Sequence, residues 1–248
     1  MDKLNLQFVS NHWGWFLFAL LVLAAGRYIL FAGTAYLSCY RFWFNVFRKY
    51  KIQPSKPKQK QLFYELSYSF STIAVFSATG FAGYLLYVNG YSKIYFTVNE
   101  RGWLYFLFSI LLMIIIHDTY FYWTHRLLHT RWFFKKIHYV HHRSVNPTPL
   151  AAYAFHPLEA LIESLVVLPI ITIIPVHIGA LLLFTFFVLF MNVMGHLGFE
   201  FMSDRMRKSR IGKLFTSSTH HNLHHQKCNK NFAYYFSFWD TIMKTFND

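Results

Sequence analysis

Histidine is the residue type whose number and spacing in this chain could do chemistry. Eight of the 14 histidines fall into three short clusters, one spaced H-x3-H and two spaced H-x2-H-H. Residues three or four apart share one face of a helix, so we expect each cluster to aim its imidazoles in one direction, as metal ligands must be aimed. The clusters are His125 and His129; His138, His141 and His142; and His221, His224 and His225.

The clustered imidazoles are too many for one metal ion. An ion accepts about four to six ligands, and imidazole suits iron, zinc, copper and nickel. A structural zinc site would normally use cysteine, whereas Cys39 and Cys228 have neither metal nor redox spacing. We therefore expect two ions. Two metals in a chain with long apolar stretches typical of a membrane protein indicate redox chemistry on a lipid. Iron is favoured because activation of dioxygen needs a metal that changes valence.

The remaining histidines have different expected roles. His196, in NVMGHLGFE at the end of an apolar segment, is expected to be a ninth ligand. His117 lies eight residues before His125, about 80° around a helix, which makes it a candidate either to line the pocket or to support a ligand. His220 is off the helical pattern of its cluster and could support a ligand, and His156 could support a ligand or serve structure. His12 and His177 are interpreted as packed residues.

Carboxylates are scarce, since the chain has only ten. Metal-bound imidazoles usually donate their second N–H to a carboxylate or a carbonyl. The candidate acceptors could equally form ion pairs at helix ends or at the membrane interface. They are Asp118, Glu159, Glu200 and Asp240.

The composition indicates a membrane protein. Hydrophobic residues make up 55% of the chain and aromatic residues 21%, in long apolar stretches. The formal net charge is +14, but the basic residues flank the apolar stretches. Binding to anionic lipid headgroups and orientation by the positive-inside rule explain this charge better than binding to nucleic acid.

The apolar stretches predict an all-α, multi-pass bundle. Residues 13–37, interrupted by Arg27, and residues 66–90 form the first two expected spans. Residues 103–129 predict one long helix, after which the chain must bend at 130–133 for the first two clusters to converge. Residues 164–195 predict either a hairpin of two spans or a re-entrant pair that turns near 175–179.

Charge predicts the orientation of these spans. Residues 41–61 carry seven Lys and Arg and no acid, which is typical of a cytoplasmic loop. The metal site is then expected on the cytoplasmic face, in a bacterial inner membrane or in the endoplasmic reticulum of a eukaryote. We divide the chain into residues 1–101, with the N-terminal spans and the basic loop, and residues 102–248, which carry the chemistry.

Four segments resemble the fatty acid hydroxylase / sterol desaturase superfamily, and are most similar to its sterol C5-desaturase-like members. They are HDTYFYWTHRLLH, KKIHYVHHRSVNPTPLAAYAFHPLEA, THHNLHH and YYFSFWDTIMKTF. The resemblance implies a di-iron enzyme that uses O2 and two external electrons to hydroxylate or desaturate a lipid, such as a fatty acyl chain or a sterol. It implies metal binding by all eight clustered histidines, with His196 in addition.

The resemblance also bears on cofactors and partners. Zinc could replace iron in purified protein, and O2 would be a co-substrate. A separate cytochrome b5-like or ferredoxin-like donor would supply the electrons. The alternatives are a histidine-rich metal transporter or sensor, whose ligands would lie at mid-membrane on several spans, and a silent lipid-binding relative. The sequence leaves the oligomeric state open.

Overall fold

Four long apolar helices form the body of the protein. The computed structural model of the chain describes the backbone of residues 3–248 and the side chains of residues 12–248. Within this part, four helical segments are long and apolar enough to cross a membrane, which confirms the expected multi-pass helical class. They are His12–Phe42, Gln59–Val88, Gly102–Leu128 and Ile178–Gly195.

The first segment is continuous but irregular. Helix α1 (Lys3–Tyr28) passes through the π-helical turns η1 (Ile29–Gly33) and η2 (Leu37–Phe42), which flank α2 (Thr34–Tyr36). The chain then forms α3 (Phe44–Phe47) and η3 (Arg48–Tyr50) and enters α4 (Gln59–Val88). Phe42, Trp43 and Val46 are exposed beside the basic residues of this connection, as expected for a segment at a membrane interface.

The second half supplies the other two long helices. Beyond β1 (Ile94–Tyr95) and η4 (Val98–Glu100), α5 (Gly102–Leu128) is the single long helix expected from the sequence. Residues 164–195, expected to form either two spans or a re-entrant pair, do turn at β2 (Val176–His177), but only the arm after the turn, α10 (Ile178–Gly195), is long enough to cross a membrane. The chain before the turn forms two short helices, α8 (Pro157–Leu165) and α9 (Val167–Ile173).

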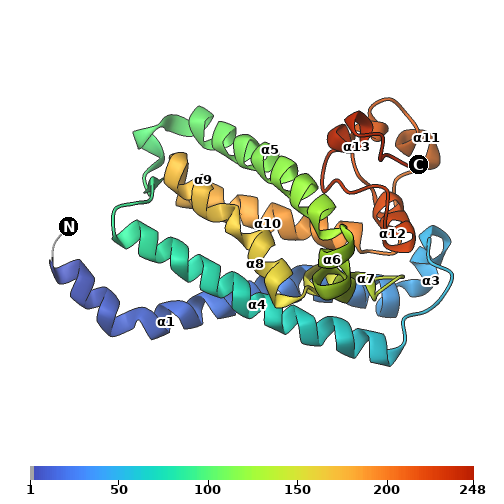
Figure 1. Cartoon of the computed structure of the whole chain (residues 1–248), viewed down its shortest axis with the longest axis horizontal. Helices are drawn as coiled ribbons and strands as arrows, with labels where there is room; N and C mark the ends of the chain where they lie inside the picture. Colours follow the sequence, from blue (N-terminus) through green and yellow to red (C-terminus); the bar gives the residue numbers. More distant parts are fainter. Residues whose placement is uncertain (1–2) are drawn as a thin grey trace.

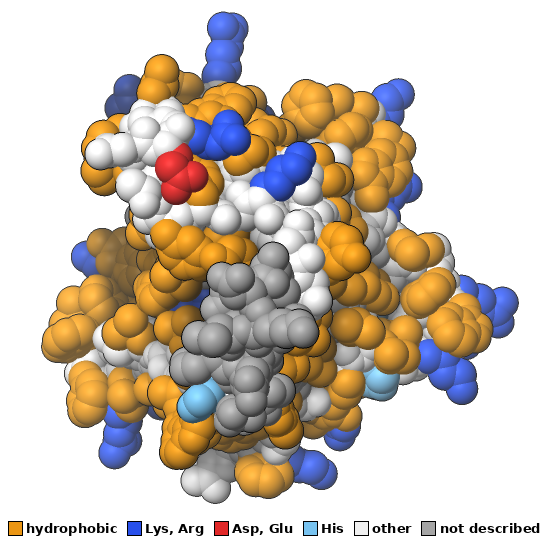
Figure 2. All heavy atoms as spheres, turned by 90° about the vertical axis from the view of Figure 1, so that its left-hand side faces the viewer, with side chains coloured by type: hydrophobic (Ala, Val, Ile, Leu, Met, Phe, Trp, Pro, Cys, Tyr) orange, Lys and Arg blue, Asp and Glu red, His pale blue; other side chains and the backbone are white. Residues whose placement is uncertain are grey.

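Two short strands are the exception to the all-α expectation. β1 and β2 pair in parallel, with Ile94 opposite Val176 and Tyr95 opposite His177. They join the α4–α5 connection to the turn between α9 and α10 at one end of the bundle. Hydrophobic side chains cover much of this end, with scattered Lys and Arg (Figure 2).

The short elements gather at the opposite end of the bundle, beyond the ends of α5 and α10 (Figure 1). They carry the second and third histidine clusters. After α5 come α6 (Arg131–Phe133), η5 (Phe134–His138), α7 (Tyr139–His142) and η6 (Pro149–Tyr153). After α10 come α11 (Asp204–Arg207), η7 (Gly212–Leu214), α12 (Ser218–Lys227) and α13 (Phe238–Ile242).

One hydrophobic core joins the N-terminal helices to the later part of the chain. Tyr28 of α1 and Ile73 of α4 are buried together with Tyr153, Leu189 and Val193. The Tyr28 hydroxyl donates to the Leu150 carbonyl at 2.8 Å. α1 and α4 therefore support η6, which follows the histidines of α7, and α10, which ends just before His196. The division at residue 101 remains a prediction.

Candidate metal centre

The end of α5 begins the site. His125 lies in the last turn of α5, and His129 caps the helix. Thr130 then adopts an extended conformation, with ψ 150°, so α6 starts in a new direction. The bend expected at residues 130–133 is thus confirmed. The π-helical turn η5 follows, a feature often found at functional sites, and it delivers His138 to the imidazoles of α5.

Nine histidines converge in two groups, and within each group the candidate ligand atoms all lie within 4.8 Å of one another. These are the nine residues that the sequence predicts as ligands. The first group comprises His125, His129, His138, His142 and His224, and the second comprises His141, His196, His221 and His225.

The histidines of each H-x2-H-H cluster are divided between the two groups, contrary to our expectation that each cluster aims in one direction. His142 joins the first group and His141 the second. Adjacent residues are separated by about 100° around a helix, whereas residues four apart nearly align. His221 and His225 therefore share one group, and His224 turns to the other. Each H-x2-H-H cluster therefore contributes histidines to both groups.

Hydrogen bonds at Nδ1 fix the protonation of several rings. His125 Nδ1 lies 2.8 Å from the Phe232 carbonyl, His224 Nδ1 lies 2.7 Å from the Lys230 carbonyl, and His196 Nδ1 lies 2.8 Å from the Asn192 carbonyl. A carbonyl only accepts, so each Nδ1 carries the proton. Nε2 of each neutral ring is then a bare lone pair.

Each of these bare nitrogens lies close to another ring nitrogen. The bare Nε2 of His125 lies 3.2 Å from His138 Nε2, and that of His196 lies 3.2 Å from His141 Nε2. His138 Nδ1 donates to Glu159 at 2.7 Å, so no proton remains between His138 and His125. A cation between the lone pairs would turn this repulsion into attraction.

The spacing also fits a metal. Ligand nitrogens about 2.1 Å from an ion are about 3.0 Å apart in an octahedron and about 3.4 Å apart in a tetrahedron. The Nε2–Nε2 contacts of the second group measure 3.0 Å for His221–His196, 3.2 Å for His225–His221 and 3.3 Å for His225–His196. The donor set and its spacing therefore fit metal ions.

Burial keeps these imidazoles neutral. His196 is 1% exposed and His224 is fully buried. Burial lowers the pKa of both rings to about 4, because the charged form loses its hydration. At neutral pH both rings are available as ligands.

The four candidate carboxylates differ in what they contact. Glu159 accepts from His138 Nδ1, as expected of a partner for a ligating imidazole. Asp240 accepts from the backbone N–H groups of Phe232 and Ala233, and so fixes the segment whose Phe232 carbonyl holds His125.

The other two carboxylates bind backbone and hydroxyl groups rather than imidazoles within the described residues. Asp118 accepts from the N–H groups of Tyr235 and Phe236, which joins α5 to the C-terminal segment. Glu200 accepts from the backbone and hydroxyl of Thr219, at the start of α12.

The remaining histidines lie outside both groups. His117 Nδ1 is 3.1 Å from the Tyr235 hydroxyl, and His220 Nε2 lies 3.5 Å from Asp248 Oδ1. His156 Nδ1 accepts from the Leu158 backbone N–H and caps α8, so its role is structural. His177 caps α10 in the same way, as expected of a packed residue.

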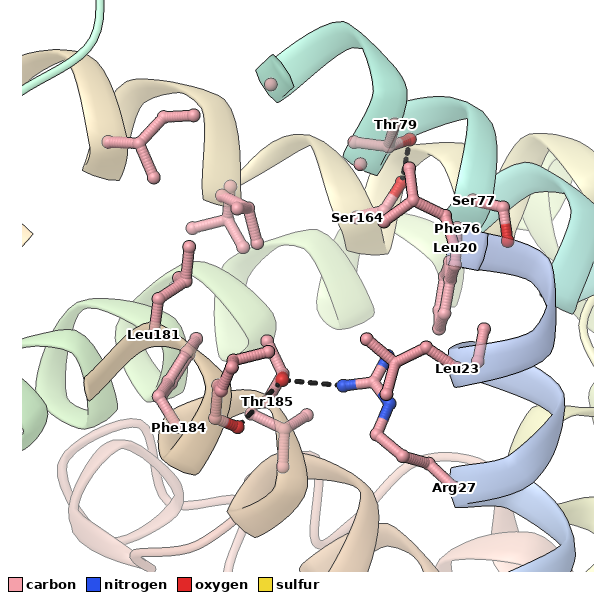
Figure 3. A pocket seen from close by; sticks show the side chains of 18 of the residues that line it. Leu20, Leu23, Arg27, Phe76, Ser77, Thr79, Ser164, Leu181, Phe184 and Thr185 are labelled. Atoms are coloured by element: carbon pink, nitrogen blue, oxygen red, sulfur yellow. Dashed lines mark hydrogen bonds between the residues drawn. The ribbon is translucent and has the colours of Figure 1, made fainter. Parts of the chain in front are cut away.

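A cavity of about 480 Å³ lies among the long helices beside this site. Its walls are mostly apolar and come from α1, α4, α5, α8, α9 and α10 (Figure 3). Phe121 and Asn192 line it, each one turn before a histidine of the site, at positions 125 and 196. The cavity therefore leads from the apolar body of the bundle towards the two groups.

The sequence analysis assigned no role to Glu163, a carboxylic acid in the wall of this cavity. It lines the cavity on α8, one helical turn beyond Glu159. The available signal was the spacing of four between the two acids, which places both on one helix face.

Comparison with known proteins places the chain in a family. The family described as "Fatty acid hydroxylase" matches residues 110–245. Lathosterol oxidase of Rattus norvegicus is 30% identical over 233 residues, covering 92% of this chain and 74% of the relative. Lathosterol oxidase of Homo sapiens is also 30% identical, with the same coverage.

Fungal proteins are similar as well. A Delta(7)-sterol 5(6)-desaturase of Schizosaccharomyces pombe is 29% identical over 220 residues, covering 88% of this chain and 68% of the relative. No solved structure matches the chain. With its four apolar helices and its histidine-lined site, the chain belongs to the fatty acid hydroxylase family and is a membrane lipid oxidoreductase.

Proposed function

We propose that the protein is a di-iron, O2-dependent enzyme that hydroxylates or desaturates a lipid. The observation that carries this proposal is the convergence of nine histidines in two groups, in each of which the candidate ligand atoms lie within 4.8 Å of one another. Five imidazoles would hold one ion and four the other. Zinc could occupy the same groups in purified protein, because imidazole suits both metals.

The chain's own residues would orient and isolate the reaction. Carbonyls of Phe232, Lys230 and Asn192, together with Glu159, hold the ligating rings in one tautomer. The buried site keeps water away from a reactive centre. When bound, iron would supply the redox chemistry with O2 that breaking an unactivated C–H bond requires.

The lipid would enter from the bilayer through the apolar cavity. The relatives named as lathosterol oxidase and Delta(7)-sterol 5(6)-desaturase make a sterol-like lipid the first substrate class to test. Fatty acyl chains remain the second class, because the cavity wall is mostly apolar.

We place the histidine end on the cytoplasmic side, where a separate cytochrome b5-like or ferredoxin-like protein would deliver electrons. Gln53 in the basic connection donates to Asn222 of α12 at 3.1 Å. The seven basic residues at 41–61 and the histidines therefore share one end of the bundle, and Lys/Arg-rich loops favour the cytoplasm.

Metal analysis of purified variants tests this proposal. We expect His224→Ala to lose metal from the five-histidine group and His141→Ala to lose metal from the four-histidine group, each with loss of lipid oxidation. His156→Asn is the matched control, because Asn can still cap α8. If oxidation survives when metal is lost, the proposal is wrong.

Lipid mass spectrometry of cells with and without the gene identifies the product. A lipid that gains one oxygen atom indicates hydroxylation, and one that loses two hydrogen atoms indicates desaturation. Metal-loaded protein that changes no lipid, with O2 and reductant supplied, would contradict the proposal.

A further inference from the structure

Exposed hydrophobic side chains gather on two short helices of the C-terminal segment. Phe238 and Ile242 of α13 and Leu214 of η7 are each more than half exposed. Phe238 and Ile242 are four residues apart and therefore share one face of their helix. Both helices lie outside the four candidate spans, so the spans do not account for this apolar surface.

Backbone and ring contacts join the two helices. The Ser237 N–H, next to Phe238, donates to the Leu214 carbonyl at 3.0 Å. Phe215 and Phe236 form an antiparallel bridge, and their ring centres are 5.6 Å apart. α13 and η7 therefore lie side by side, and we call their exposed apolar residues the cap surface. It comprises Ile211, Leu214, Phe215, Phe238 and Ile242.

The cap surface continues onto the outer side of α5. Trp239 of α13 donates from Nε1 to Thr119 Oγ1 at 3.2 Å, and its ring centre lies 5.4 Å from that of Trp123. Trp123 and Leu127 are exposed and lie four residues apart on α5, a candidate membrane span. Figure 1 shows α13 beside the second half of this helix. The cap surface is thus continuous with a face that a bilayer covers.

The contact with α5 sets the depth of α13. α5 begins at Gly102, beside the exposed Arg101 and Trp103, a combination typical of a membrane interface. Thr119 lies about 26 Å further along the helix axis and Trp123 about 32 Å. The hydrocarbon core of a bilayer is about 30 Å thick. α13 therefore meets α5 where the hydrocarbon ends and the headgroups of the other leaflet begin.

The charges around the cap surface match an anionic leaflet. Residues 205–239 carry seven Lys and Arg and no acid. Arg210 and Lys213 are exposed beside Ile211 and Leu214. Long basic side chains hold their charge among headgroups while their apolar stems cover hydrophobic surface, and they attract anionic lipid. Apolar residues with a basic rim are typical of helices that lie in the membrane interface.

We propose that α13 and η7 dip into the bilayer and that the cap surface binds the anionic leaflet on the side of the histidines. This binding needs neither metal nor substrate, and it adds a membrane contact outside the four candidate spans. A protein partner is the other possible occupant, but the continuity with α5 and the depth of α13 favour lipid.

The leaflet then supports part of the metal site. Asp240 of α13 accepts from the backbone N–H groups of Phe232 and Ala233. The Phe232 carbonyl in turn accepts from His125 Nδ1. α13 therefore links the membrane surface to the five-histidine group.

Spin labels measure the immersion of α13 and η7. Phe238→Cys, Ile242→Cys and Leu214→Cys are labelled singly, with Cys39 and Cys228 replaced by Ser, in nanodiscs of phosphatidylcholine and phosphatidylglycerol. O2 concentrates in hydrocarbon, whereas an uncharged nickel chelate stays in water. We expect O2 to relax all three labels more strongly than the chelate does.

Two further positions calibrate the measurement. Leu111→Cys, at an exposed position inside α5, should give a label that O2 relaxes more strongly. Asn229→Cys, at an exposed position just after α12, should give a label that the chelate relaxes more strongly.

A double variant tests whether the apolar face of α13 causes the immersion. Phe238→Gln combined with Ile242→Gln should reverse the order at the label on position 214, so that the chelate relaxes it more strongly than O2 does. Thr241→Gln is the matched control, because it changes an exposed polar residue of the same helix, and it should preserve the order. In nanodiscs of phosphatidylcholine alone, the chelate should relax the label at 214 more strongly than it does with phosphatidylglycerol.

The proposal is wrong if any of the three labels behaves like the label at 229, since the cap surface would then face water and be open to a protein partner. An unchanged order in the double variant, or an equal effect of the chelate with and without phosphatidylglycerol, would also overturn it. Neither metal loading nor lipid oxidation enters these measurements, so their outcome is independent of the His141→Ala and His224→Ala results.

Discussion

At the residue scale, the hydrogen bond at Nδ1 decides what each imidazole can bind. Backbone carbonyls hold His125, His196 and His224, whereas His138 alone among these depends on a side chain, Glu159. A side-chain acceptor, unlike a backbone carbonyl, can be changed by substitution. The five-histidine group is therefore the one that a single conservative substitution can weaken.

We expect Glu159→Gln to weaken metal binding to the five-histidine group about 10- to 100-fold, which is typical when a group that orients a ligand is changed. Titration of metal-free protein against a competing chelator measures this. Glu100→Gln, which changes an exposed acid of η4 at the opposite end of the bundle from the metal site, should leave metal binding as in the wild type. Equal affinity in both variants would show that Glu159 does not orient His138.

Acid should destabilise the metal-free protein. The pKa of His196 and of His224 is lowered by burial to about 4, below the value of about 6.5 in an unfolded chain. Between these values the unfolded chain binds protons that the folded protein does not, so stability is complete above about pH 7 and falls as the pH drops from about 6.5 towards 4.

This dependence is measured by the midpoint of thermal unfolding, taken as the temperature at which half of the monodisperse protein is lost. Zinc-loaded protein is the control, because bound metal competes with protons and should preserve the midpoint at lower pH. A midpoint of the metal-free protein that stays constant from pH 7 to about pH 5 would be inconsistent with buried neutral imidazoles.

At the scale of elements, the turn after α10 positions the second group. Gly198 has φ 72°, and a Cβ there would meet the Tyr40 hydroxyl and the Gln53 amide. Tyr40 donates to the Leu197 carbonyl at 2.9 Å, immediately after His196. The close approach lets the first membrane segment support a histidine from the fourth.

We expect Gly198→Ala to reduce metal in the four-histidine group and to lower the thermal midpoint. Gly90→Ala is a matched control, because Gly90 also has positive φ, 77°, but a Cβ there meets nothing within 4 Å. Backbone strain is common to both variants, so the difference between them isolates the steric clash. Equal metal content in the two would refute the role of this contact.

The long helices and the bend at Thr130 could be predicted because they depend on local properties. Apolar length gives α5, and the nine-residue spacing of His129 and His138 requires a bend if both serve one site. The assignment of His141 and His142 to different groups was not predicted. We treated each cluster as one helix face and did not follow the angular position of each residue around the helix. Similarly, Asp118 and Glu200 bind backbone groups of distant segments, which spacing in the sequence does not reveal.

At the scale of the whole molecule, orientation in the membrane can be measured directly. We expect residue 55 to be cytoplasmic and residue 99 to be on the opposite side, because residues 41–61 are strongly basic. Ser55→Cys and Asn99→Cys place exposed thiols in these two connections, in a background where Cys39 and Cys228 are replaced by Ser.

A membrane-impermeant maleimide applied to intact bacterial cells that express the protein should label position 99 and not position 55. Permeabilised cells should label both, which controls for reactivity. Labelling at position 55 alone in intact cells would invert the orientation.

The shared core of α1 and α4 with later segments has a consequence for biosynthesis. Tyr28 and Ser69 both donate to the Leu150 carbonyl, and 122 residues separate Tyr28 from that acceptor. At ribosomal rates the acceptor emerges on the order of ten seconds after Tyr28. During that interval the hydroxyl groups of Tyr28 and Ser69 lack their final acceptor. The insertion of the first two membrane helices must therefore depend on their own hydropathy. The later segments then stabilise two helices that are already in the bilayer.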